Sequence, residues 1–256
     1  MINKLEHKID ELNSMKKYPN ELFFIGNTQL LKKRKISIVG SRHPSQYSQK
    51  YTHLIAQGLS QRDIAVVSGA AIGVDSIAHN SAGTNNTIAV VANGLDIKYP
   101  AINKKLIEKI EQNGLMVSAY KQGEKARNYT FVLRNEIVVA LSEALIVTHA
   151  DEKSGTLTSI NYALKMGKKV YTIPHRIDES KGTQKLLEKG LIEPIYCIET
   201  FLNSFAKVKS NENSIEKYLK TFPSYEEAIA KYSNEIFELE LDGKIIIENG
   251  YIKPIF

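Results

Sequence analysis

The sequence contains a single cysteine, no tryptophan and no long apolar run. One cysteine, Cys197, excludes an internal disulfide framework and a zinc site built from several cysteines. No apolar stretch approaches the length of about 20 residues that a membrane-spanning helix needs. The charged N-terminus also lacks the apolar region of a secretory signal. We therefore expect a cytoplasmic protein with no membrane partner.

Several well-known site motifs are missing as well. The sequence has no Gly-x-Gly-x-x-Gly dinucleotide fingerprint, no P-loop and no His-Glu-x-x-His zinc motif. It also has no Gly-x-Ser-x-Gly nucleophile elbow. Asp75 and His79 lie four residues apart, and we interpret them as a helix-start carboxylate and a packed imidazole rather than an acid–base or metal pair. We expect no cofactor, no metal and no catalytic residue.

The middle of the chain, from residue 36 to about 203, alternates short runs rich in Val and Ile with stretches of helical period. Near-continuous apolar runs are typical of strands buried on both faces of a parallel sheet. The alternation predicts a doubly wound, mostly parallel α/β sheet. The expected strands are Ile36–Val39, Ala65–Val67, Thr87–Val91, Leu115–Ser118, Ala144–Thr148 and Lys169–Ile173. The expected helices are Gln46–Gln61, Asp75–Ala82, Ala101–Asn113, Phe131–Ser142 and Thr156–Met166.

The ends of the chain differ from this middle segment. Residues 1–35 are polar and Lys-rich and are taken as an N-terminal extension, with the main domain at 36–206 and a linker or frayed helix end at 204–212. Residues 213–256 form a second domain, in which Ser224 and Glu227 match a capping box and Asn249-Gly250 predicts a hairpin turn. Helices are expected at Ser214–Lys220, Ser224–Tyr232 and Asn234–Leu241, with hairpin strands Lys244–Glu248 and Tyr251–Ile255, a winged-helix outline.

The charge of the chain is divided unevenly between these domains. The whole chain has 34 Lys and Arg against 28 Asp and Glu, a net charge of +6. Residues 213–256 hold five Lys and eight acids, a net charge of −3, so residues 1–212 carry +9. The acidic tail would face DNA phosphates unfavourably, and we interpret it as a protein-interaction or stabilising module.

Three small-residue turns follow expected strands, where open parallel sheets bind their ligands. The turns are Gly40-Ser41-Arg42, Ser68-Gly69 with the residues up to Asp75, and Ser154-Gly155-Thr156. Backbone amides at a helix start favour an anion, and an arginine fork matches phosphate oxygens. Any one turn is also explained by tight strand-to-helix geometry, but three together make a larger polar rim than one mononucleotide needs.

The stretch 125–135 interleaves cations with aromatic residues. Arg127, Tyr129, Phe131 and Arg134 lie where an expected loop enters an expected helix. Cations hold phosphates, and an aromatic face stacks on a base of any identity. The alternative, a helix with Phe131 in the core and solvated arginines, is left open by the pattern alone.

Taken in order, these motifs resemble the DNA-processing protein A (DprA/Smf) family over roughly residues 18–200 and the tail. The resemblance rests on Val39–Arg42, Val67–His79, Thr87–Pro100, Phe131–Asn135, Ser154–Thr156, Pro174 and Gly182-Thr183. It implies an extended Rossmann-like fold with a C-terminal winged-helix-like module, and a homodimer that binds single-stranded DNA. It also implies that the protein protects incoming strands and helps load the RecA recombinase in natural transformation. The expected DNA-binding residues are Gly40, Ser41, Arg42, Ser68, Gly69, Arg127, Phe131, Arg134, Asn135, Ser154, Gly155 and Thr156.

The chain also departs from the family pattern. Ile72 and Glu136 stand where an Arg is frequent, and His175 stands where Gly often follows Pro. Two further departures are Asn93 and Ala119.

The rival function is a nucleotide-binding or phosphoribohydrolase-like enzyme of the lysine-decarboxylase-like superfamily. Ser159 stands where the motif of that superfamily requires its catalytic carboxylate, and a hydroxyl cannot replace a carboxylate as general acid or base. We therefore favour a non-catalytic DNA binder.

Overall fold

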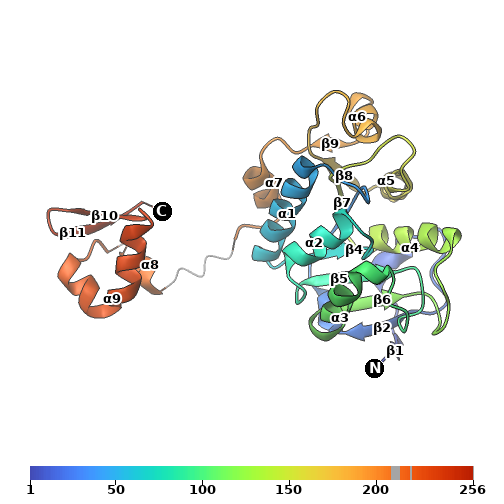
Figure 1. Cartoon of the computed structure of the whole chain (residues 1–256), viewed down its shortest axis with the longest axis horizontal. Helices are drawn as coiled ribbons and strands as arrows, with labels where there is room; N and C mark the ends of the chain where they lie inside the picture. Colours follow the sequence, from blue (N-terminus) through green and yellow to red (C-terminus); the bar gives the residue numbers. More distant parts are fainter. Residues whose placement is uncertain (209–213, 220, 256) are drawn as a thin grey trace. The chain divides into compact units, whose positions relative to one another are not determined.

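The chain forms two compact units, Met1–Val208 and Lys209–Phe256 (Figure 1). The computed structural model describes residues 1–208, 214–219 and 221–255. Part of the expected linker, residues 209–213, and Lys220 at the end of an expected helix lie outside the described residues. Among the described helices, each is too short or too polar to cross a lipid bilayer.

A nine-stranded sheet forms the centre of the larger unit, with strand order β1-β2-β6-β5-β4-β3-β7-β8-β9. The six expected strands all occur, each end within one residue of its expected position, and they are parallel. They are β3 (Lys35–Val39), β4 (Ala65–Ser68), β5 (Thr87–Val91), β6 (Leu115–Ser118), β7 (Ala144–Val147) and β8 (Lys169–Thr172). This confirms the predicted α/β class. Because β4 and β7 lie on opposite sides of β3, the strand order changes direction there, and ligands bind at such a point in open sheets.

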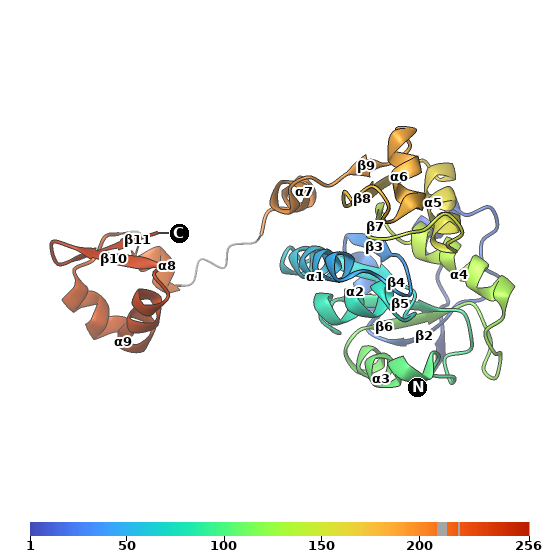
Figure 2. The same cartoon turned by 45° about the horizontal axis from the view of Figure 1, so that its top comes forward.

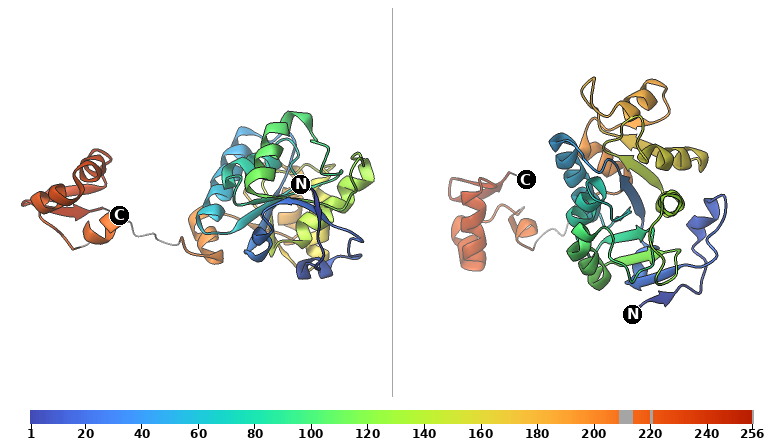
Figure 3. Two further views of the ribbon diagram at one scale, coloured as in Figure 1. Left: turned by 90° about the horizontal axis from the view of Figure 1, so that it is seen from below. Right: turned by 45° about the vertical axis from the view of Figure 1, so that its right-hand side comes forward.

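Helices cover both faces of the sheet (Figure 2). One face packs against α1 (Gln46–Gln61), α2 (Val74–Ala82), α3 (Lys104–Asn113) and α7 (Ile198–Phe205). The other packs against α4 (Asn128–Ala140) and α5 (Thr156–Lys165), and Figure 3 shows the same layers from two further sides. Alternate strand residues serve the two faces: Ile36 and Ile38 meet α1, whereas Val39 lies in the cluster with α4. Burial on both faces explains why the strands read as continuous apolar runs.

The first 35 residues, expected to form an extension, add strands to the edge of this sheet. β2 (Phe23–Gly26) pairs antiparallel with β6, and β1 (Asn3–Lys4) pairs with β2. Two 3-10 helices, η1 (Asp10–Ser14) and η2 (Thr28–Lys32), bury Leu12 and Leu30 in the core. The apolar run at residues 22–25 supplies side chains to both faces, so this segment belongs structurally to the larger unit.

The remaining differences concern short elements. The sequence did not predict α6 (Lys181–Glu188), α7 or β9 (Glu193–Pro194). A 3-10 turn, η3 (Ala101–Asn103), precedes α3, and α4 begins at Asn128, three residues before the expected start. This early start is fixed by Thr130, whose Oγ1 accepts the Arg127 N–H at 2.8 Å.

The smaller unit contains helices followed by a hairpin, as predicted. It comprises α8 (Ser214–Leu219), α9 (Tyr225–Leu241), β10 (Ile245–Glu248) and β11 (Tyr251–Pro254). The backbone of α9 is not helical at Tyr232 (φ −142°, ψ 47°), so the element consists of two helical segments, as expected from the sequence. Its own core includes Leu219, Ile236 and Ile252.

Candidate nucleic-acid interface

A groove of about 590 Å³ lies at the carboxyl ends of β3, β4 and β7, beside the first turns of α4 and α5. It is therefore formed at the point where the strand order changes direction. The groove brings together eight of the predicted DNA-binding residues: Ser41, Arg42, Phe131, Arg134, Asn135, Ser154, Gly155 and Thr156.

The turn after β3 holds an arginine over an aromatic ring. The Ser41 N–H donates to the His149 carbonyl at 2.8 Å, which fixes this turn against the end of β7. Arg42 is exposed, and its Cζ lies 5.6 Å from the centre of the Phe131 ring. Among the described residues Arg42 makes no ion pair, so its guanidinium is left to bind an anion while the ring below orients it.

Arg134 lies under the floor of the groove and bonds to the protein's own backbone. It is only 5 % exposed, and its Nη1 donates to the carbonyls of Gly69 and Val90. Its Nε has no hydrogen-bond partner among the described residues. A Cβ at Gly69 would overlap the guanidinium, which explains the glycine there. Arg134 therefore ties the ends of β4 and β5 together and adds a buried positive charge beneath the groove.

Asp75 and His79 lie beside Arg134 and are both buried. The Asp75 carboxylate accepts the Gly69 N–H at 3.1 Å; burial raises its pKa, and the Arg134 charge opposes that rise. Burial and the same Arg134 charge lower the pKa of His79 to about 3. The His79 ring contacts the Thr87 hydroxyl at 2.6 Å, which agrees with the packed imidazole expected from the sequence.

The turn before α5 supplies the opposite side of the groove. Its Ser154 N–H donates to the Asp151 carbonyl at 3.0 Å, and the Ser154 hydroxyl accepts the Thr156 N–H at 3.2 Å. Lys153 also lines the groove, and sequence reasoning missed it although a cation within a predicted anion-binding turn was a usable signal. Ser159 lies in the same groove and is 2 % exposed, so no carboxylate stands at the position that the rival enzyme would require.

The other four predicted residues lie elsewhere. Gly69 lines a smaller cavity of about 70 Å³, which Arg42, Ile72, Tyr99 and Phe131 also line. Gly40 allows close packing, since a Cβ there would come within 2.7 Å of Val74. The buried Ser68 hydroxyl donates to the Ile38 carbonyl at 2.6 Å. Arg127 is exposed and lines neither cavity.

One departure from the family pattern proves to lie away from the groove. Glu136 is 7 % exposed and accepts the Lys16 N–H at 3.0 Å, so it fastens α4 to the N-terminal segment. Its carboxylate therefore does not replace a cation in the groove.

A sequence profile of the family described as DNA recombination-mediator protein A matches residues 6–206. The chain belongs to this family. The DNA processing protein DprA of Streptococcus pneumoniae is 37 % identical over 184 residues, which cover 70 % of this chain and 65 % of that protein. The Smf protein of Synechocystis is 38 % identical to this chain, and the matched part covers 40 % of the length of that protein.

Solved structures of two family members share the fold. DNA processing protein A from Helicobacter pylori, described for its single-stranded DNA binding mode, is 38 % identical with a TM-score of 0.78; the alignment covers 80 % of this chain and 95 % of that one. DprA from Streptococcus pneumoniae is 32 % identical with a TM-score of 0.73, covering 79 % of this chain and 73 % of that one. Both findings confirm the predicted family and its Rossmann-like fold.

Proposed function

We propose that the groove binds single-stranded DNA through its phosphates, with a base stacked on Phe131. Arg42 is the residue on which the proposal depends: it is exposed, has no ion pair within the described chain, and lies over the Phe131 ring. In such a pair the cation binds a phosphate and the aromatic ring stacks on a base of any identity. The net charge of +9 on residues 1–212 and the Helicobacter relative's description support the same ligand.

We further propose that the protein acts as a non-catalytic homodimer in the cytoplasm. In this role it protects incoming single strands and hands them to a RecA-type recombinase during natural transformation. The family membership supports this role, and Ser159 in place of a catalytic carboxylate supports binding without chemistry.

Fluorescence anisotropy tests the ligand. Labelled oligo-dT and a duplex of equal length are titrated at about 50 mM and about 200 mM salt; we expect preference for the single strand and affinity that falls steeply with salt, because neutralised phosphates release counterions. Equal affinity for the duplex, or an affinity that does not respond to salt, would overturn the proposal.

A matched pair of variants locates the site. Arg42→Ala should weaken oligo-dT binding by roughly tenfold, the loss of one charge-assisted contact, and lower the salt slope by about one. Arg127→Ala removes the same charge from outside the groove and should change affinity by less than about twofold. If Arg127→Ala costs more than Arg42→Ala, the strand binds along the start of α4 instead.

A further inference from the structure

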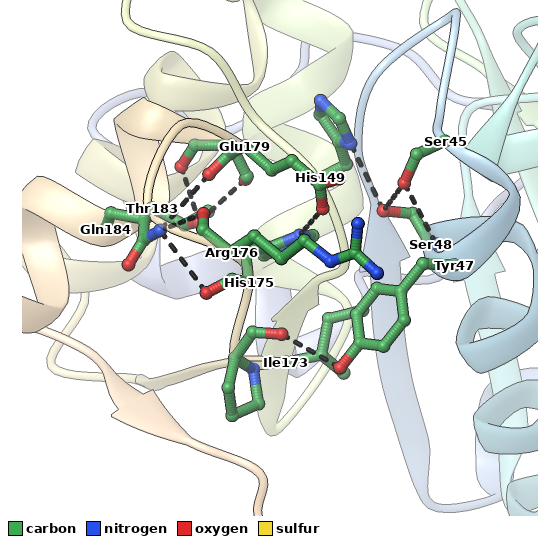
Figure 4. Close-up of polar contacts among 12 residues, drawn as sticks. Ser45, Tyr47, Ser48, His149, Ile173, His175, Arg176, Glu179, Thr183 and Gln184 are labelled. Atoms are coloured by element: carbon green, nitrogen blue, oxygen red, sulfur yellow. Dashed lines mark hydrogen bonds and ion pairs between the residues drawn. The ribbon is translucent and has the colours of Figure 1, made fainter.

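A second polar cluster lies beside the groove, at the ends of β7 and β8. We call it the histidine cluster: Ser48, His149, His175, Arg176 and Glu179 (Figure 4). His175 and Arg176 follow β8, His149 follows β7, and Ser48 lies in the first turn of α1. The cluster therefore continues the line of strand ends that forms the groove.

His149 links the cluster to the groove directly. Its carbonyl accepts the Ser41 N–H at 2.8 Å, and Asp151, two residues later, lines the groove. Its ring Nδ1 lies 3.1 Å from the Ser48 hydroxyl, and its Nε2 lies 3.7 Å from the Asp151 carboxylate. This second distance is longer than a hydrogen bond, so the Asp151 carboxylate is a neighbour of the ring without bonding to it.

The buried ring of His175 has the same kind of neighbour. Its Nε2 lies 3.0 Å from the Thr148 carbonyl, an arrangement in which Nε2 carries the proton. The other nitrogen, Nδ1, has no hydrogen-bond partner among the described residues and lies 3.8 Å from the Glu179 carboxylate. While the ring is neutral, its Nδ1 and the Glu179 carboxylate are therefore two hydrogen-bond acceptors that face one another. Burial lowers the pKa of His175, which keeps this ring neutral at ordinary pH.

Arg176 provides a cation at the surface of the cluster. Its side chain is exposed and makes no ion pair or hydrogen bond among the described residues. In Figure 4 it extends from the end of β8 toward the start of α1, where Tyr47 and Ser48 lie. Tyr47 holds this side of the cluster by donating to the Pro174 carbonyl at 2.9 Å. The Glu179 N–H donates to the Arg176 carbonyl at 2.9 Å, so Arg176 and Glu179 belong to the same backbone turn.

We propose that the histidine cluster is a proton-gated phosphate site, which extends the DNA path beyond the groove. Arg176 contacts a phosphate of the strand. When His175 is protonated, its ring pairs with the Glu179 carboxylate, which would otherwise repel this phosphate. His175 is a positioning residue, because its side chain is fully buried and acts through Glu179. The proposal rests on single-stranded DNA being the ligand of the groove.

The direction of the pH dependence follows from the groups that surround the His175 ring. Burial lowers the pKa of His175, and the His149 ring, 5.6 Å away between centroids, lowers it further, whereas the Thr148 carbonyl and the Glu179 carboxylate raise it. Tyr47, facing from α1, stays neutral because burial raises its pKa. A bound phosphate adds negative charge and so favours the protonated form of the His175 ring. The complex therefore holds more protons than the free protein, and affinity rises as pH falls.

The test compares affinities for a labelled oligo-dT of about 20 nucleotides at about pH 8 and about pH 6, using the full chain and a dye that does not titrate in this range. Thymine also stays neutral there. From the higher to the lower pH we expect the affinity of the unmodified protein to rise roughly tenfold. His175→Gln, which keeps an N–H for Thr148 but cannot be protonated, should lose most of this rise and bind normally at about pH 8.

Arg176→Ala tests the contact itself, and its exposed position leaves the fold intact. It should lose roughly fivefold in affinity at about pH 6 and less than twofold at about pH 8. Lys165→Ala is the control, because this exposed cation lies in the last turn of α5, at the end of the helix away from the groove, and it should leave the pH response unchanged. If affinity changes equally with pH in the unmodified protein, His175→Gln and Arg176→Ala, the proton gate is overturned. This conclusion holds even where Arg42→Ala weakens binding, because that variant tests the groove alone. Absence of oligo-dT binding at both pH values would overturn the proposed function and this inference together.

Discussion

At the scale of single residues, the sequence located the residues that form the floor of the groove but did not reveal what each of them does there. The sequence pattern predicted Arg134 as a phosphate contact, and the residue does line the groove. However, its Nη1 bonds to the Gly69 and Val90 carbonyls. A motif does not reveal whether a cation meets a ligand or its own backbone, because that depends on side-chain direction and on strands distant in sequence. The same limit applies to two other cations. Lys153 lies inside the groove although the pattern did not select it, and Arg127 lies outside the groove although the pattern did.

His79 makes the stability of the larger unit depend on pH. Its pKa falls from 6.5 to about 3 on folding, so the folded protein keeps the ring neutral while the unfolded chain takes up a proton below about pH 6.5. This stabilisation is complete above that pH and is lost by up to about 1.4 kcal/mol for each pH unit below it. His79→Asn keeps an N–H for Thr87 and does not titrate. Urea unfolding followed by circular dichroism at about pH 7 and about pH 5 should show a loss that is about 2 kcal/mol smaller in the variant. Equal losses in both proteins would show that His79 is not the responsible group.

At the scale of elements, strand prediction worked where burial leaves a strong pattern. Strands β3 to β7 are buried along their whole length, so their apolar runs end where the strands end. Expecting ligands at the carboxyl ends of the strands then located most of the groove. The N-terminal elements were missed for a physical reason. Leu12, Leu22 and Leu30 lie far apart in a Lys-rich segment, and only tertiary contacts bring them into one core.

Strand β2 provides a test of how firmly that N-terminal segment is built into the sheet. Gly26 has φ +103°, and a Cβ there would overlap the Gly114 carbonyl beside β6. We expect Gly26→Ala to lower the free energy of unfolding by about 2 kcal/mol or more. Gly190→Ala is the control, because Gly190 also has positive φ (+65°) but open space around its Cβ position; it should cost about 1 kcal/mol. Thermal unfolding of both variants measures the difference. Equal shifts would mean that β2 detaches at no cost to the core.

At the scale of the whole molecule, the uneven charge separates the roles of the two units. Residues 213–256 carry −3 and have their own apolar core, whereas the groove and the histidine cluster belong to the unit that carries the positive excess. Removing residues 209–256 should therefore leave the affinity for oligo-dT within about threefold of the full chain, with a small gain at low salt as negative charge is removed. The slope of affinity against salt should not change, because it counts the phosphates that cations neutralise. Anisotropy titrations of both proteins at several salt concentrations measure affinity and slope together. A tenfold loss with a shallower slope would show that the small unit contributes phosphate contacts despite its charge. A tenfold loss at constant slope would assign it an indirect role, such as holding the larger unit in a form able to bind DNA.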